Sequence, residues 1–194
     1  MHKKNLKAFC FISDYDRDYI KKLDKQIGII VRNYKNPPDI KKLKELISFC
    51  KSTNRKVFLA NQIRLALNLK FDGVYIPSFN KKINFIINKR TEDFIILGSA
   101  HNFKEIRIKE KQGVDIIFIS PLFKVIKSNK FLGVCRFNTL AHTTIKKVVA
   151  LGGIDDQNIK KLNILKANGF AGISYFKKKR PCKGPLKYFN LWLN

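Results

Sequence analysis

Acidic residues are scarce in this chain. It has 14 Asp and Glu against 40 Lys and Arg among 194 residues, so the formal net charge is +26. Such an excess of positive charge indicates an anionic partner, which could be nucleic acid, an acidic membrane surface or phosphorylated metabolites. The lysines are scattered over positions expected to face solvent, whereas nucleic-acid-binding modules gather their charge on one face. We therefore expect solvated surface charge and no nucleic-acid partner, with residues 177–180 as the candidate exception.

Paired cysteines and long apolar runs are also missing. Cys10, Cys50, Cys135 and Cys182 lie far apart, without a CxxC pair or a His at ligand spacing, which argues against a zinc site or a disulfide framework. Reduced thiols are typical of the cytoplasm. The apolar run at residues 8–12 is too short for a signal peptide, and no run could span a bilayer. We expect a soluble cytoplasmic protein with no membrane partner.

The chain does contain enough apolar residues to fold. Hydrophobic residues make up 45% of the sequence and aromatic residues 12%, which argues against disorder. The length allows one sizeable core, and we find no linker or low-complexity tract. We expect a single domain over residues 1–194.

Short runs rich in Val, Ile and Phe recur along the chain, with helical patterns between them. The runs cover residues 7–13, 27–32, 57–60, 73–76, 94–97, 116–120, 148–151 and 172–176. The helical patterns cover residues 15–24, 38–53, a short stretch ending at 66, and residues 81–88, 103–112, 139–145 and 156–167. Because the strand-like runs are apolar throughout, both faces of each strand should be buried, as in a parallel sheet. The pattern predicts an α/β fold, a compact (β/α)8 TIM barrel, with an open doubly wound sheet as the alternative.

Polar or glycine positions fall where the expected strands end. They are Arg32, Asn61, Ser78, Ser99, Ser120, Gly152, Gly153 and Lys177. A TIM barrel keeps its site at the carboxyl ends of its strands, so this placement favours the barrel over the open sheet.

The segment 147–159 combines an apolar run, two glycines and a helical pattern that starts at an Asp. Gly152 and Gly153 would let the backbone approach a bound group, and the first turn of the helix would point N–H donors at the same place. The segment therefore predicts an anion-binding loop, although a turn that merely needs glycine is the alternative.

Four segments of the second half carry recognisable motifs. Residues 97–105 contain Ser-x-His-x-x-x-Glu, residues 113–123 read GVDIIFISPLF, residues 150–154 read ALGGI, and residues 167–173 read ANGFAGI. In order and spacing, these segments resemble the thiamine phosphate synthase and TenI family, and the resemblance extends over residues 7–176.

The resemblance implies a transferase of thiamine biosynthesis. Such an enzyme condenses hydroxymethylpyrimidine pyrophosphate with thiazole phosphate to give thiamine phosphate and pyrophosphate. The site then needs cations around the leaving pyrophosphate, polar groups that hold the pyrimidine, and a cradle for the thiazole phosphate. By position in the motifs, the expected catalytic residues are Arg32, Lys130 and Ser99, and the expected substrate-binding residues are Asn61, Lys127, Ser128, Gly152, Gly153, Phe176 and Lys177.

The chain also departs from the family pattern. Gln62 and Asn80 stand where the family has the carboxylates that hold Mg²⁺, and amides are poor partners for a hard dication. Tyr34 replaces a family Lys, and Pro121 stands where the TenI branch has a His. Mg²⁺ is therefore a doubtful cofactor. Lysines could replace part of its charge, it could arrive with the substrate's pyrophosphate, or the chemistry could be lost.

Two other functions stay open at this point. One is a non-catalytic or divergent barrel that binds a phosphorylated thiazole or thiamine ligand. The other is a basic nucleic-acid-binding protein, for which affinity should fall steeply with salt.

Overall fold

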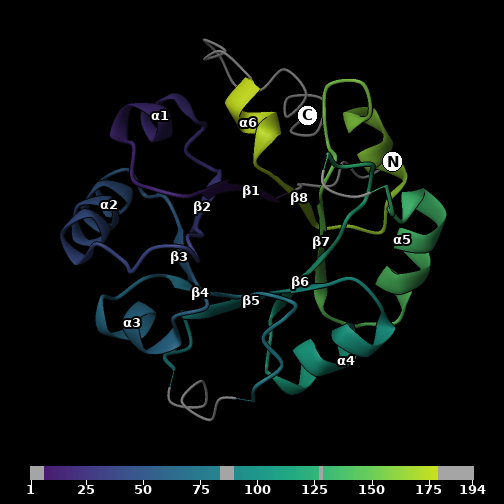
Figure 1. The fold of residues 1–194 in the computed structure, drawn as a ribbon, viewed down its shortest axis with the longest axis horizontal. Helices are drawn as coiled ribbons and strands as arrows, with labels where there is room; N and C mark the ends of the chain where they lie inside the picture. The colour runs from purple at the N-terminus through teal and green to yellow at the C-terminus, as the bar shows by residue number, and fades with distance from the viewer. Residues whose placement is uncertain (1–6, 84–89, 127–128, 179–194) are drawn as a thin grey trace.

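In the computed structural model of the protein, eight parallel strands pair in sequence order and close into a barrel (Figure 1). The structure describes residues 7–83, 90–126 and 129–178. The strands are β1 (Lys7–Ile12), β2 (Gly28–Val31), β3 (Val57–Ala60), β4 (Gly73–Ile76), β5 (Ile95–Ala100), β6 (Ile116–Ile119), β7 (Lys147–Leu151) and β8 (Gly169–Gly172). The predicted compact (β/α)8 barrel is confirmed, and the open sheet is wrong. The single-domain prediction also covers residues 1–6 and 179–194, which lie outside the described residues.

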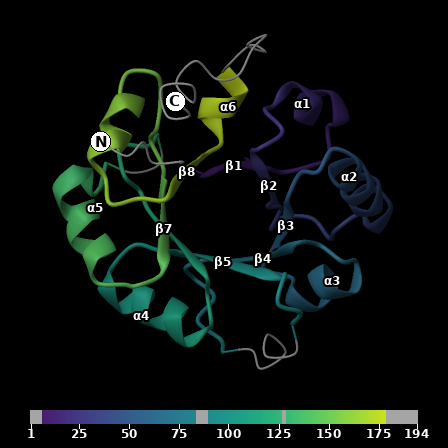
Figure 2. The ribbon, with the colours of Figure 1, turned by 180° about the vertical axis from the view of Figure 1, so that it is seen from behind.

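Helical segments surround the barrel on the outside (Figures 1 and 2). They are α1 (Arg17–Lys22), α2 (Ile40–Ser52), α3 (Ile63–Asn68), α4 (Phe103–Lys111), α5 (Gly133–His142), the 3₁₀ segment η2 (Ile159–Ile164) and α6 (Ser174–Lys178). The N-cap side chains Asp16, Asp39 and Asn102 accept backbone N–H groups at the starts of α1, α2 and α4. None of the helices in the described ranges is long and apolar enough to cross a bilayer.

The last strand lies earlier in the chain than the sequence pattern predicted. Residues 172–176 read as a strand, but β8 ends at Gly172 and the following residues form α6. A Cβ atom on Gly169 would lie 2.2 Å from the carbonyl oxygen of Lys7 on β1. The closing strand therefore needs a glycine, and this glycine concealed the strand from a search for β-branched runs.

Two helix predictions also need correction. Residues 139–145 were expected to be helical, but α5 begins at Gly133 and buries Phe137 and Ala141. The helix predicted for residues 156–167 is only the short η2, which buries Ile159 and Leu162. The helix predicted at residues 81–88 falls mostly on residues outside the described ranges, and residues 81–83 are not helical.

Aromatic rings fill the interior of the barrel. The ring of Phe118 lies 5.1 Å from that of Phe9, 6.2 Å from that of Phe11 and 5.5 Å from that of Tyr75, all edge to face. Phe58 packs against Phe9 at 6.0 Å. Such edge-to-face pairs are favourable beyond the area that they bury. Because these rings occupy the interior, a barrel site is expected at the carboxyl ends of the strands.

Candidate active site

Arg32 places a positive charge at the carboxyl end of β2. Its N–H donates to the carbonyl of Ile12 at 2.8 Å, and its guanidinium carbon lies 4.8 Å from the centre of the Phe11 ring. This cation–π contact orients the charge. Within the described ranges, no carboxylate forms an ion pair with Arg32. A half-buried cation without a carboxylate partner is available to an anionic ligand.

Tyr75 connects Arg32 with Ser99. The Phe11 and Tyr75 rings are 5.1 Å apart, and the Tyr75 phenol is hydrogen-bonded to Ser99, which is itself buried. Burial raises the pKa of Tyr75, although the Ser99 hydrogen bond and the charge of Arg32 act to lower it. The phenol therefore stays neutral near pH 7. The sequence prediction missed Tyr75, whose signal is an aromatic residue with a polar atom near the end of a buried strand.

Asn61 and Asn80 form a pair of amides beside these residues. Asn61 follows β3 with a φ of 60°, and its N–H donates to the carbonyl of Tyr75 at 2.8 Å. The Nδ2 of Asn80 donates to the Oδ1 of Asn61 at 2.7 Å, and the Oδ1 of Asn80 accepts from the N–H of Lys82 at 3.1 Å. These bonds fix how both amides point.

The described residues at this position do not fit a protein-held Mg²⁺. The oxygens of Asn61 and Asn80 already accept hydrogen bonds, and Gln62 offers only another neutral amide at the start of α3. No cluster of three His, Cys, Asp or Glu able to hold a metal occurs among the described residues. Mg²⁺ prefers carboxylate oxygens and phosphate oxygens of the substrate.

His101 joins the ends of β4 and β6. Its Nδ1 lies 2.7 Å from the carbonyl oxygen of Ser120, which can only accept, so Nδ1 carries the proton. Its Nε2 then accepts from the hydroxyl of Ser78 at 3.0 Å. The N–H of His101 donates to Glu105 at 2.7 Å. His101 and Glu105 thus stabilise the start of α4 and its neighbouring loops.

Gly152 and Gly153 follow β7 with φ values of 97° and 70°. A Cβ atom on Gly153 would lie 2.5 Å from the carbonyl oxygen of Lys124, and one on Gly152 would lie 3.1 Å from Pro121. Only glycine satisfies both the conformation and the space. Among the described residues, no acceptor is hydrogen-bonded to the N–H of Gly152 or Gly153, so these two donors are available to an anion.

The expected contribution of a helix start to this anion loop is wrong. The carboxylate of Asp155 accepts the N–H groups of Gln157 and Asn158, both at 3.0 Å. The segment that follows is the 3₁₀ segment η2. The N–H groups of Gln157 and Asn158 are therefore already engaged by a negative charge and are not available to an anion.

Phe176 and Lys177 lie on α6 rather than at the end of a strand. Phe176 is 3% exposed and stacks on Phe170 at 5.8 Å, so its side chain packs in the core outside the barrel. The role predicted for Phe176 in substrate binding stays a prediction. Lys177 is exposed, and its charge acts to lower the pKa of Cys10, which burial raises.

The loop between β6 and α5 is described only in part. Lys130 is exposed on it, whereas Lys127 and Ser128 lie outside the described residues. The roles predicted for these three residues stay predictions.

Tyr34 follows β2 and Phe79 follows β4, both on the carboxyl side of the barrel. Their rings lie 5.4 Å apart, edge to face, and they are 47% and 62% exposed. Burial raises the pKa of Tyr34. Where the family has a Lys, this chain therefore has the neutral ring of Tyr34, packed against that of Phe79.

Among the described residues, the mouth of this closed (β/α)8 barrel carries an arginine without a carboxylate partner, amides, and glycine N–H groups without an acceptor. These features are typical of the class of barrel proteins that bind phosphorylated small molecules. The sequence model described as "Thiamine monophosphate synthase" matches residues 25–176. The chain belongs to this family, and the predicted resemblance is confirmed.

Individual relatives agree with this assignment. A thiamine-phosphate synthase of Prochlorococcus marinus is 32% identical over 142 residues, which cover 70% of this chain and 41% of that longer relative. One of Hydrogenobaculum sp. is 27% identical over 174 residues, 82% of this chain and 78% of its own length. The solved structure of a thiamine phosphate pyrophosphorylase from Pyrococcus furiosus matches with a TM-score of 0.70 and 19% identity, covering 88% of this chain and 87% of that one. This structural likeness supports the fold.

Proposed function

We propose that the protein is a cytoplasmic thiamine-phosphate synthase. It would condense hydroxymethylpyrimidine pyrophosphate with thiazole phosphate to give thiamine phosphate and pyrophosphate. The observation that carries the proposal is the family match over residues 25–176, a range that begins before Arg32 and includes every residue of the candidate site except Lys177. The partners are thus phosphorylated small molecules.

Arg32 is proposed to stabilise the leaving pyrophosphate. In the reaction, the bond between the pyrimidine methylene carbon and the pyrophosphate oxygen breaks, and its electron pair leaves with the pyrophosphate. The thiazole nitrogen forms the new bond to the same carbon. A guanidinium that is already oriented by Phe11 can meet the growing negative charge without reorganisation, which is the most effective form of electrostatic catalysis. Lys130, and Lys127 in the adjoining loop, would add positive charge.

Ser99 and Asn61 are proposed to hold the pyrimidine. Ser99 is buried beside the Tyr75 phenol, and Asn61 is fixed by Asn80. The exposed rings of Tyr34 and Phe79 would cover an aromatic substrate ring. The N–H groups of Gly152 and Gly153, with Lys177, would bind the thiazole phosphate.

Charge neutralisation in this proposal comes from Arg32 and the lysines. The residues at the family's metal positions do not fit Mg²⁺, so no step is assigned to a protein-held metal. An ion that arrives with the pyrophosphate of the substrate would use phosphate oxygens as its ligands.

The test is a turnover assay with both substrates and Mg²⁺, in which thiamine phosphate and pyrophosphate should appear in equal amounts. The variant Arg32→Gln should lose this activity while it keeps its thermal stability. An absence of turnover together with tight binding of thiazole phosphate would replace the proposal with its alternative, a non-catalytic barrel that binds phosphorylated thiazole. The replaced metal carboxylates at Gln62 and Asn80 are the observation that favours this alternative.

A further inference from the structure

The segment that follows β4 has no helix in residues 77–83, so its backbone carbonyls need other partners. A lysine from α4 supplies them. The side chain of Lys109 is 0% exposed. Its Nζ donates to the carbonyl oxygens of Pro77 and Asn80, both at 2.8 Å, and to the Oε1 of Gln112 at 2.9 Å. All three protons of the ammonium group are thus used.

Gln112 completes this arrangement at the end of α4. Its Nε2 donates to the carbonyl oxygen of Asn80 at 3.0 Å and to that of Lys82 at 2.8 Å. Asn80 is therefore held from behind by two side chains. We call Lys109 and Gln112 the carbonyl clamp.

The path of the lysine across the barrel wall is built into β5. A Cβ atom on Gly98 would lie 3.0 Å from the Cδ of Lys109 and 2.8 Å from Val114. Any larger residue would meet the stem of the lysine, so Gly98 leaves the room that the clamp requires.

A buried ammonium is expensive to maintain. No carboxylate forms an ion pair with Lys109 among the described residues, and burial lowers its pKa to about 8 while Glu105 acts to raise it. An apolar side chain of similar length would avoid the desolvation cost. The clamp therefore implies that the position of the held segment matters.

The held segment ends in the amide pair at the mouth. Because Asn80 Oδ1 accepts from Lys82, its Nδ2 must face Asn61. Asn61 then receives this bond on its Oδ1, so its own Nδ2 takes no part in it. No partner for this Nδ2 occurs among the described residues, so its two N–H donors can reach an oxyanion.

We infer that Lys109 and Gln112 are positioning residues that act through Asn80 to make Asn61 a hydrogen-bond donor to the anionic substrate. The inference rests on the proposed function, and it assigns the N–H donors of Asn61 to the pyrophosphate end of the same substrate in place of the pyrimidine. It adds a role for two buried residues, and it states which amide of the pair donates and which accepts.

The test is a double-mutant cycle read by the affinity for inorganic pyrophosphate, measured by calorimetry well below the melting temperature of each variant. Lys109→Met and Asn61→Gly should each weaken binding about tenfold, the range for losing a hydrogen bond to a charged group. Glycine keeps the left-handed backbone of position 61. The double variant should bind no more weakly than Asn61→Gly alone, because Lys109 acts only through this residue.

Lys111→Met is the matched control, since it removes one exposed lysine from the same helix and should leave binding nearly unchanged. If Lys109→Met does not fold, Gln112→Leu enters the same cycle with a smaller loss. Additive losses in the double variant, or unchanged affinity in Lys109→Met, would overturn the inference, as would a wild-type protein that does not bind pyrophosphate. A wild-type protein that binds pyrophosphate but makes no thiamine phosphate would overturn the proposed function alone.

Discussion

The two ends of this barrel hold their arginines in different ways. At the amino ends of the strands, Arg55 and Arg90 have ion-pair or hydrogen-bond partners. Arg90 and Asp115 form a two-pronged ion pair with distances of 2.8 and 3.0 Å. Arg55 donates to four backbone carbonyls at the end of α1 and before β2. At the carboxyl ends, Arg32 has no such partner among the described residues. One end is thus built for stability, and the other keeps its hydrogen-bonding capacity for a ligand.

A repeated device stabilises the amino end. A side chain just before β4, β6 or β8 accepts an N–H from the first or second residue of the strand that precedes it. Asp72 binds Val57, Asp115 binds Ile96 and Asn168 binds Val148, at 2.7 to 2.9 Å. The same side chains thus set the register of neighbouring strands while they occupy polar groups that would otherwise be unsatisfied.

The largest expected effect tests the carboxyl end. Arg32→Gln should lower kcat/KM by about a hundredfold to a thousandfold, because it removes a preorganised positive charge from the leaving pyrophosphate. Steady-state kinetics and thermal unfolding measure the two properties separately. Lys35→Gln, which removes an exposed charge nearby, is the control. A variant that unfolds as easily as it loses activity would show that Arg32 serves the fold, and the contrast between the two ends would fail.

The complementary change at the amino end is Asp115→Ala. It removes the ion pair with Arg90 and the acceptor for Ile96, and should lower the free energy of unfolding by about 2–3 kcal/mol. Denaturant unfolding gives the stability, and kinetics at a temperature where the variant is folded give the activity. A loss of kcat in the folded variant would contradict the separation of the two ends.

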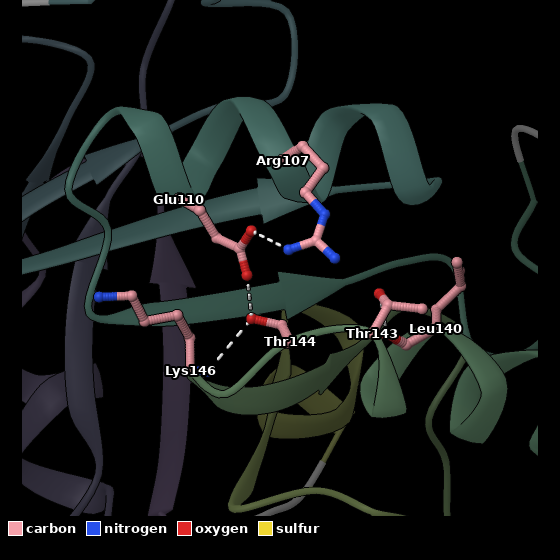
Figure 3. Close-up of polar contacts among 6 residues, drawn as sticks. All are labelled: Arg107, Glu110, Leu140, Thr143, Thr144 and Lys146. Atoms are coloured by element: carbon pink, nitrogen blue, oxygen red, sulfur yellow. Dashed lines mark hydrogen bonds and ion pairs between the residues drawn. The ribbon is translucent and has the colours of Figure 1, made fainter.

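A smaller loss of stability is expected when the hydrogen-bond network between α4 and the start of β7 is broken (Figure 3). Thr144 donates to Glu110 at 2.6 Å and accepts from the N–H of Lys146 at 3.1 Å, and Glu110 also accepts from Arg107 at 2.7 Å. Thr144→Val should therefore cost about 1–2 kcal/mol of unfolding free energy.

The neighbouring Thr143→Val is the matched control for this network. The hydroxyl of Thr143 donates only to the carbonyl of Leu140, at 2.7 Å, at the end of α5. Its loss should cost less than the loss of Thr144. Equal costs for the two variants would show that Glu110 gains nothing from Thr144.

The smallest expected effect is on how steeply the free energy of unfolding changes with pH. Burial lowers the pKa of Lys109 to about 8, from 10.5 in the unfolded chain. Between these values the unfolded chain binds a proton that the folded protein has released, so this group makes stability rise with pH across that window. Below about pH 8 Lys109 is charged in both states, and the folded protein bears the full cost of burying this charge. Denaturant unfolding at pH 7.5 and 9.5 should show this rise in the wild type but less of it in Lys109→Met, and equal slopes would contradict a buried ammonium.

Much of the barrel was predictable, because β3 and β4 are continuous apolar runs with clear ends. The closing strand β8 was not, since its contact with β1 requires glycine at position 169. Arg32, Asn61 and Ser99 could be placed because the carboxyl ends of parallel strands meet at one edge. Lys109 could not, because a lysine in a basic chain looks like surface. The one available signal is that it follows the buried Ile106 by three residues, on the inward face of α4.

The aromatic side chains that fill the barrel form a packed layer between its two ends. With Phe118 in contact with Phe9, Phe11 and Tyr75, water and ions have no route through the middle. An affinity tag, a fluorophore or a surface attachment placed at the amino end would therefore report on the protein without entering its chemistry.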